Sequence, residues 1–296
     1  LQSQGHEVFG IGRSERKEPL LLGLDWEYHK HHLTYEPEPV IHLLRQKQPD
    51  FIINFAAQGE SAASFNEDSW RYYETNCLGL SRLVSRLESV FIQIGSSEVY
   101  GPTAKPALES QAITPTSPYS ISKGAFDLHL EAIRGKIVPF NIVRPSNAYC
   151  AGQQLHRVIP KALLAGLTGR RFQLQGGGKA KKSYIDAHDL SRAILMICQK
   201  GTRGEIYNVG PNDPVSIRQV VEIAATYAGR AFDDFIDNSP ARFGEDRQYW
   251  INSEKVRALG WTPETSLKAG IGKVFEWVRD NKEQLARMPT EFQIRP

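Results

Sequence analysis

The fold can be read most directly from two segments, FIQIGSSEVYG (residues 91–101) and SPYSISK (residues 117–123). The first begins as a short apolar run, which is typical of a buried strand, and ends in the polar residues Ser96, Ser97 and Glu98. Polar side chains at the end of a buried parallel strand lie at the carboxyl edge of the sheet, where α/β proteins bind their ligands. We therefore predict a functional site at this edge.

The second segment predicts the start of a helix. Ser117 can cap it and Pro118 suits its first turn, so Tyr119 and Lys123 lie four residues apart on one helical face. Because an ammonium group stabilises a phenolate, we expect Lys123 to lower the pKa of Tyr119. The two side chains could then form a proton shuttle beside a hydride acceptor. The alternative is a chance match on an amphipathic surface helix.

Outward from these segments, short apolar runs alternate with stretches of helical periodicity. We predict strands at VFGIG (8–12), FIINFAA (51–57), FIQIG (91–95) and IVPFNIVRP (137–145). Helical spacing is found in PVIHLLRQKQ (39–48), NCLGLSRLVSRLE (76–88) and YSISKGAFDLHLEAIRG (119–135). The alternation predicts an α/β fold, a doubly wound parallel sheet of the Rossmann type with helices on both faces.

After residue 150 the pattern changes to helices, short strands and loops. We predict a dinucleotide-binding domain over residues 1–150 and a smaller α/β, mainly substrate-binding part over residues 151–296. The apolar run IYNVG (206–210) is expected to return to the first sheet, so that the two parts are interleaved.

The start of the chain departs from a dinucleotide-binding pattern. Such a sheet begins with a strand and a glycine-rich turn, whose bare backbone admits the pyrophosphate at a helix N-terminus. Residues 1–5 instead resemble the end of the helix after that turn, and VFGIG the second strand. We expect roughly 20 residues to precede Leu1, from the size of a strand plus most of a helix.

Composition indicates an ordinary globular protein. Hydrophobic residues make up 41%, charged residues 23%, and the net charge of +3 over 296 residues gives no case for a nucleic-acid partner. Three widely spaced cysteines favour a reducing compartment, and no apolar run reaches about 18 residues, so we expect a soluble cytoplasmic protein without a membrane partner. The cluster His29, His31 and His32 lacks further ligands at metal spacing, and we predict no metal site.

Several motifs resemble the extended short-chain dehydrogenase/reductases, specifically the nucleotide-sugar 4,6-dehydratases, over nearly the whole chain. NFAAQGESAASF (54–65), GSSEVYG (95–101) and SPYSISK are similar to segments of GDP-mannose 4,6-dehydratases. The segments RPSNAY (144–149) and RFGEDRQYWINSEKVRALGW (242–261) look more like dTDP-glucose 4,6-dehydratases. The resemblance leaves the nucleotide base and the sugar open.

The resemblance implies roles for single residues. Ser96, Tyr119 and Lys123 match the catalytic triad of the family, Glu98 matches the base that takes the C5 proton, and Ser97 stands where dTDP-glucose enzymes have an acidic aspartate. The residues matched to substrate binding are Gln58, Asn147, Lys182 and Arg242. The residues matched to cofactor binding are Arg13, Ser14, Leu33, Ala56, Ala57, Gln58, Asn76, Tyr119 and Lys123.

Cofactor choice depends on the end of the strand VFGIG. An acidic residue there accepts the ribose 2′-hydroxyl in NAD enzymes, whereas an arginine accommodates the 2′-phosphate of NADP. The chain has Gly12, Arg13 and Ser14 at this point and no acid until Glu15. This favours NADP, leaves NAD possible, and leaves open that Arg13 is an exposed loop residue.

The resemblance therefore implies an NAD(P)-dependent lyase that forms a 4-keto-6-deoxy sugar nucleotide by internal hydride transfer. It also implies a homodimer, paired through helices equivalent to residues 70–88 and 118–134. Three alternatives stay open: a nucleotide-sugar epimerase or 4-reductase, a UDP-glucuronate decarboxylase, and a non-enzymatic dinucleotide-binding protein.

Overall fold

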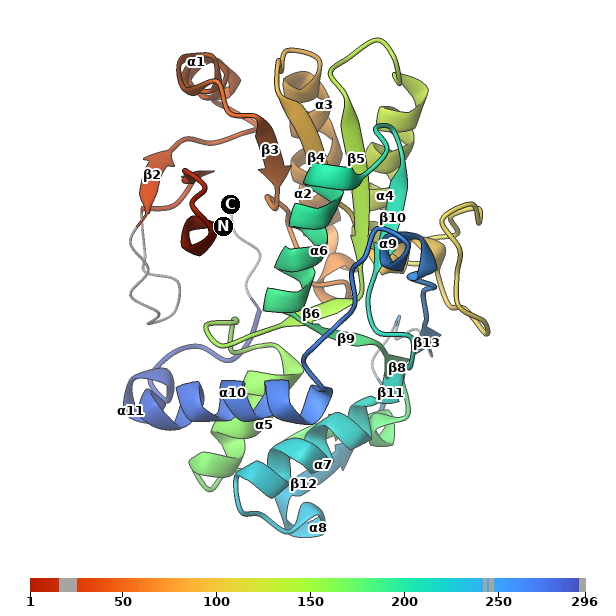
Figure 1. Ribbon diagram of the computed structural model, residues 1–296. Helices are drawn as coiled ribbons and strands as arrows, with labels where there is room; N and C mark the ends of the chain where they lie inside the picture. Colours follow the sequence, from red (N-terminus) through yellow and green to blue (C-terminus); the bar gives the residue numbers. More distant parts are fainter. Residues whose placement is uncertain (16–25, 242–243, 245–247, 293–296) are drawn as a thin grey trace.

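The computed structural model describes residues 1–15, 26–241, 244 and 248–292, and its centre is a parallel sheet (Figure 1). Four strands lie in the order β10-β5-β4-β3. Their bounds are β3 (Phe51–Asn54), β4 (Val90–Ile94), β5 (Phe140–Pro145) and β10 (Ile206–Val209). Two further strands, β1 (Phe9–Gly12) and β2 (Glu27–Lys30), pair in parallel beside them. The predicted Rossmann-type α/β fold is confirmed.

Helices cover both faces of the sheet because successive side chains of a strand point to opposite faces. On β4, Phe91 packs into a core with α1, α3 and α4, whereas Ile92 packs into a core with α6. The bounds are α1 (Pro37–Lys47), α2 (Trp70–Tyr73), α3 (Gly79–Val84), α4 (Pro118–Ala132) and α6 (Ala187–Lys200). The helices predicted at residues 39–48, 76–88 and 119–135 correspond to α1, α3 and α4, although α3 is shorter than expected.

The second part of the chain has a core of its own, built mainly by α5 (Val158–Leu167), α7 (Ile217–Tyr227) and α10 (Leu267–Asp280). Short strands form three small sheets, in the orders β6-β9, β12-β7 and β11-β8-β13. Their bounds are β6 (Asn147–Tyr149), β7 (Phe172–Gln175), β8 (Lys181–Lys182), β9 (Tyr184–Asp186), β11 (Val215–Ser216), β12 (Ile236–Ser239) and β13 (Gln248–Tyr249). The remaining short helices are α8 (Phe232–Phe235), α9 (Glu254–Arg257) and α11 (Lys282–Leu285). From this second part of the chain, β10 returns to the central sheet and pairs with β5.

The sheet is divided into two pieces, where the sequence predicts one. Strand β1 pairs with β2 and β3 pairs with β4, and no described residue pairs with the facing edges of β1 and β3. Figure 1 shows β2 standing apart from β3. A cavity of about 1310 Å³ runs along this gap, lined on both sides by apolar strand residues that include Phe9, Ile11, Phe51 and Ile53. Neither edge strand is therefore sealed by backbone pairing.

Within the described ranges, every helix is too short or too polar to cross a lipid bilayer.

Candidate active site

The end of β4 forms the centre of the site. Gly95 N donates to Val143 O at 2.7 Å, which keeps β4 against β5 for one residue beyond the strand. Ser96 then caps a 3-10 turn (Ser97–Tyr100), and its Oγ accepts from Glu98 N at 3.1 Å. Ser96 and Ser97 are buried, while Glu98 is half-buried. The three polar residues thus lie at the carboxyl edge of the sheet, as the sequence predicts.

Helix α4 brings the second group of residues to this edge. Its start carries a capping box, in which Ser117 Oγ accepts from Ser120 N at 3.1 Å and Ser120 Oγ accepts from Ser117 N at 3.0 Å. Pro118 occupies the first turn, where its missing N–H costs nothing. The predicted cap is present, and it fixes the first turn of the helix from which Tyr119 projects.

Tyr119 meets Ser96 and Glu98 in front of the strand end. Burial and, after it, the charge of Glu98 raise the pKa of Tyr119 to about 12, and a hydrogen bond with Ser96 opposes both effects. The expected net lowering of this pKa is not observed: Ser96 and Arg157 lower it by less than burial and Glu98 raise it, and Lys123 Nζ donates to Ile94 O at 2.6 Å. Burial also lowers the pKa of Lys123 to about 8. The site therefore joins a hydroxyl, a carboxylate and a phenol, with an ammonium group behind them.

Two aromatic and basic residues complete the surroundings of Glu98. Tyr249 on β13 donates a long hydrogen bond of 3.5 Å to Glu98 Oε2. Lys182 on β8 lies with Nζ 4.8 Å from the centre of the Tyr249 ring. Sequence reasoning identified Lys182 but missed Tyr249, because a tyrosine in a strand of two residues looks like an ordinary core residue.

An ion pair lies near Tyr119, and sequence reasoning did not identify its residues. Arg157 Nη1 bonds Glu60 Oε2 at 2.9 Å, and both charges act on the pKa of Tyr119, Arg157 lowering it and Glu60 raising it, after the larger effects of burial, Glu98 and Ser96. Glu60 lies in the segment NFAAQGESAASF (54–65), whose resemblance assigns it no role, and Arg157 lies in none of the quoted motifs.

The residues predicted to hold the substrate are placed in part. Asn147 begins β6, where its backbone N donates to Ser183 O at 3.1 Å and its side chain is half-buried. Gln58 is buried in the loop after β3. Arg242 lies outside the described residues, so the structure places Gln58, Asn147 and Lys182 alone of this group.

The gap between β1 and β3 opens onto the residues predicted to hold the cofactor. Those that line the cavity are Arg13, Ser14, Leu33, Ala56, Ala57, Gln58 and Tyr119. Asn76 and Lys123 do not line it. Asn76 is fully buried and instead fixes the loop after β3, since its Oδ1 accepts from Gln58 N at 2.8 Å and its Nδ2 donates to Gln58 O at 3.0 Å.

This cavity fits a nicotinamide dinucleotide in size and in the chemistry of its lining. Its volume exceeds the range of about 300–1,000 Å³ usual for small-ligand pockets. Arg13 and Ser14 stand at the carboxyl end of β1 at one side, and Tyr119 stands at the other. Glu15, the first acidic residue after β1, is engaged in an ion pair with Lys30. Among the described residues, no group of three or more His, Cys, Asp or Glu side chains is arranged to hold a metal ion.

Comparisons with known proteins agree with this geometry. The family model described as NAD dependent epimerase/dehydratase family matches residues 1–210. The dTDP-D-glucose 4,6-dehydratase of Homo sapiens is 32% identical over 251 residues, which cover 81% of this chain and 71% of the human protein.

Solved structures of similar fold include a dehydratase and an epimerase. The dTDP-glucose 4,6-dehydratase of Bacillus anthracis, in complex with NAD, superposes with a TM-score of 0.82 at 26% identity, over 95% of this chain and 91% of that one. The UDP-glucose 4-epimerase of Thermotoga maritima, with UDP-glucose, reaches a TM-score of 0.85 at 22% identity over 95% and 93% of the two chains, and this likeness shows the fold alone. The chain belongs to the NAD dependent epimerase/dehydratase family.

Proposed function

We propose that the chain is a nucleotide-sugar 4,6-dehydratase, a lyase that forms a 4-keto-6-deoxy sugar nucleotide. The observation that carries this proposal is the meeting of Glu98 with Ser96 and Tyr119 at the end of β4. Oxidation and reduction at C4 need a hydroxyl, a phenol and an ammonium group. A carboxylate in the same place adds a base for the neighbouring carbon, which dehydration requires and simple oxidation does not.

The first half of the reaction is oxidation at C4. A bound nicotinamide dinucleotide supplies the hydride acceptor. Tyr119 takes the proton of the sugar O4, and Ser96 holds that oxygen by a hydrogen bond. Because burial raises the pKa of Tyr119 to about 12, a nearby positive charge is needed for it to act as a base near neutral pH. We assign this task, in the complex with sugar and cofactor, to Lys123 on the same helix, whose Nζ here donates to Ile94 O.

The second half is loss of water across C5 and C6. The C4 ketone acidifies the C5 hydrogen, and Glu98 removes it. A proton from Glu98 or Ser97 then assists departure of the C6 hydroxyl as water. The hydride taken from C4 would then return from the cofactor to C6 as C5 regains a proton, which gives the 4-keto-6-deoxy sugar. Tyr249, within hydrogen-bond distance of Glu98, helps to hold the carboxylate in position through this transfer.

Binding roles follow from position and charge. We assign Asn147 and Lys182, together with Arg242, to the substrate phosphates, and Arg13 to the 2′-phosphate of NADP. Support for Arg13 is its place at the end of β1 on the cavity wall and the engagement of Glu15 by Lys30. The Bacillus anthracis protein was solved with NAD. The preference for NADP is therefore a proposal for the present chain alone.

We also propose that the protein is a homodimer. Large apolar side chains are exposed on α2, on the turn that follows it and on α4, and these segments pack against one another. The residues are Trp70, Tyr73, Leu78, Ile121 and Leu128. A contiguous apolar helix face of this kind is typical of an interface.

Replacement of Glu98 by glutamine tests the reaction. The change preserves size and removes the proton acceptor, so C4 oxidation should survive while dehydration falls by about 10² to 10⁴. The assay incubates parent and variant with dTDP-glucose, UDP-glucose, GDP-mannose and UDP-glucuronate, and follows product mass and reduced cofactor. Glu98→Gln should accumulate reduced cofactor during a turnover.

The matched variant is Tyr119→Phe, which should abolish both signals because oxidation precedes every later step. A Glu98→Gln protein that dehydrates its sugar at the parent rate would remove the dehydratase assignment. Loss of carbon dioxide by the parent would identify a decarboxylase, and inversion at C4 without loss of mass an epimerase.

A further inference from the structure

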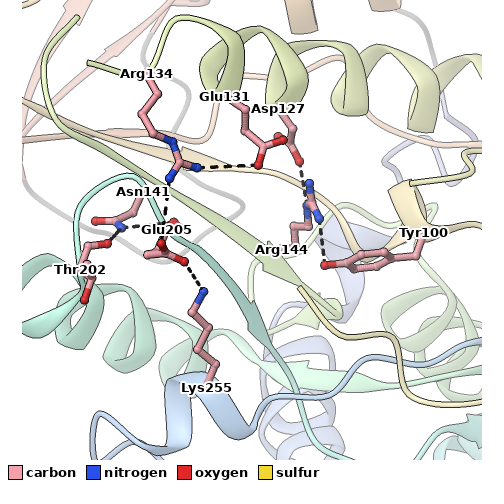
Figure 2. A network of polar contacts seen from close by, with 9 residues as sticks. All are labelled: Tyr100, Asp127, Glu131, Arg134, Asn141, Arg144, Thr202, Glu205 and Lys255. Atoms are coloured by element: carbon pink, nitrogen blue, oxygen red, sulfur yellow. Dashed lines mark hydrogen bonds and ion pairs between the residues drawn. The ribbon is translucent and has the colours of Figure 1, made fainter. Parts of the chain in front are cut away.

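A buried ion pair lies directly behind the catalytic strand end. Arg144 Nε on β5 donates to Asp127 Oδ2 on α4 at 2.9 Å (Figure 2). Their side chains are 2% and 0% exposed. Burying two charges is costly unless the pair is well placed, and it is weak evidence of stability in itself. The position of this pair is therefore more informative than its presence.

The pair contacts both the end of β4 and the 3-10 turn that follows it. A Cβ added at Gly95 would lie 3.3 Å from Arg144 Cγ and 3.3 Å from Asp127 Oδ2, so the pair packs immediately beneath the residue before Ser96. Arg144 Nη1 also donates to Tyr100 Oη at 2.9 Å, at the end of the 3-10 turn that carries Glu98. Figure 2 shows Arg144 reaching from Asp127 to Tyr100.

Asp127 is also the charged neighbour of Lys123. Residues four apart on a helix lie on one face, one turn from each other. Asp127 Oδ1 is buried and has no hydrogen-bond partner among the described residues. Its charge therefore acts on Lys123 through space, without competing for the bond from Lys123 Nζ to Ile94 O.

The charges around Lys123 come from three elements. Tyr119 and Asp127 lie on its own helix, Arg144 on β5 is paired with Asp127, and Glu98 and Tyr100 lie on the turn after β4. The pKa of Lys123 is lowered to about 8, because burial lowers it by more than Asp127 raises it. Burial raises the pKa of Asp127 itself, and Arg144 and Lys123 oppose that effect, so the three charges act on one another.

We propose that Asp127 is a positioning residue for Lys123: tied to β5 by Arg144, its carboxylate keeps the Lys123 side chain an ammonium ion beneath the end of β4. Arg144 holds that carboxylate in place and links it, through Tyr100, to the turn that carries Glu98. This inference rests on the proposed function, in which Lys123 must be charged for Tyr119 to accept a proton.

Asp127→Asn tests the proposal, because it removes the charge and keeps the shape. The alkaline limb of the pH profile for C4 oxidation, followed as reduced cofactor in a single turnover, should move to lower pH by about one unit, the low end of the effect of an opposite charge a few ångström away. Asp127→Glu restores the charge and should return the limb toward its parent position. An unchanged limb in Asp127→Asn overturns the proposal.

A matched control separates this role from a merely structural one. Asp189 is a second buried carboxylate, 1% exposed, which accepts from Arg192 Nη1 at 2.8 Å and from the backbone of Thr265 at 2.9 Å, away from the site. Asp189→Asn should lower the melting temperature without moving the alkaline limb. If it moves the limb as far as Asp127→Asn does, the effect is general destabilisation and the proposal fails.

A measurement without turnover separates this proposal from the proposed function. In protein with isotope-labelled lysine, the NMR resonance of Lys123, assigned by its loss in Lys123→Arg, should titrate at lower pH in Asp127→Asn than in the parent. If Asp127→Asn does not fold, the titration is measured on the parent protein instead. The carboxyl resonance of Asp127 should then show an inflection at the midpoint of Lys123, and its absence overturns the coupling. Neither result depends on which sugar is dehydrated.

Discussion

Arg13 stands at the point where the chain leaves β1 and enters the wall of the cavity. It also lies close enough to His32 to add to the lowering of the His32 pKa, after the larger effect of burial. At this end of the cavity Glu15 is paired with Lys30, and Glu36 and Glu74 oppose the effect of Arg13 on His32. A ligand phosphate would meet the guanidinium there, and a ribose hydroxyl would find no free carboxylate at Glu15.

Arg13→Asp should therefore shift cofactor preference from NADP toward NAD, since a carboxylate repels the 2′-phosphate and accepts the ribose hydroxyl. We expect the ratio of the two dissociation constants to change by about tenfold or more, which corresponds to about 1.4 kcal/mol. Titration calorimetry with each dinucleotide measures it. Arg218→Asp, which makes the same charge change on α7 in an exposed ion pair with Glu222, should leave the ratio alone. An equal ratio in both variants would make Arg13 a bystander.

Single residues of the site were predictable where a motif and a strand end coincide. Ser96, Glu98 and Tyr119 come together as expected because the carboxyl edge of a sheet collects the ends of its strands. The direction of the Lys123 side chain was not predictable, since it depends on the carbonyl of Ile94, which accepts from Lys123 Nζ and from Gln93 Nε2. Asn76 is matched to cofactor binding by the resemblance, yet its amide is bonded to the Gln58 backbone inside the core.

Among the elements, α4 is the one that the sequence predicts best, and the turn before α3 is the one that it does not predict. Helix α4 begins at the predicted cap and carries a periodic apolar face. Between α2 and α3 the chain forms a π-helical turn (Glu74–Leu78), which places Asn76 in the core. Such a turn adds one residue to the helical repeat and often occurs at functional sites. No local pattern marks it, because its stability comes from the bonds that Asn76 makes to a distant loop.

The cap of α4 should be worth more than an ordinary one. Ser117 is 1% exposed, and its Oγ accepts from Ser120 N and also from Ser61 Oγ at 2.9 Å. Ser117→Ala leaves the buried Ser120 N and the half-buried Ser61 Oγ without this acceptor, so the free energy of unfolding should fall by about 1–2 kcal/mol. Urea denaturation followed by circular dichroism measures the loss. Ser266→Ala, at the exposed cap of α10, should cost less because water can bond Ala269 N. Equal losses would contradict a special role for the buried cap.

At the scale of the whole molecule, the alternation of apolar runs and helical stretches predicts the order of strands and helices, whereas contacts between distant segments decide how the elements are exposed. Strand and helix order follow from the periodicity of short segments, and the parallel pairing of β3, β4 and β5 follows from the intervening helices. The exposed helix face of α2 and α4 became visible only when burial was known.

Leu128→Glu should convert the proposed homodimer to a monomer. Leu128 is 52% exposed on α4, and a carboxylate in the centre of an apolar interface would be buried without a partner. Light scattering coupled to size exclusion gives the mass of each variant. Leu108→Glu makes the same change at a side chain that is 51% exposed outside these helices, and it should leave the mass unchanged. A parent protein that elutes as a monomer at micromolar concentration would count against the interface.

The facing edges of β1 and β3 have a consequence for the colloidal behaviour of the 1–296 polypeptide. Each edge carries a row of N–H and C=O groups that no described residue pairs, beside an apolar cavity. Unpaired edges are templates for strands of other molecules. Because the edges of β1 and β3 differ, a strand donated from one molecule to the next makes a head-to-tail contact, which propagates where it does not close. Turbidity should therefore grow with concentration even where the fold is intact, and occupation of the cavity should suppress it.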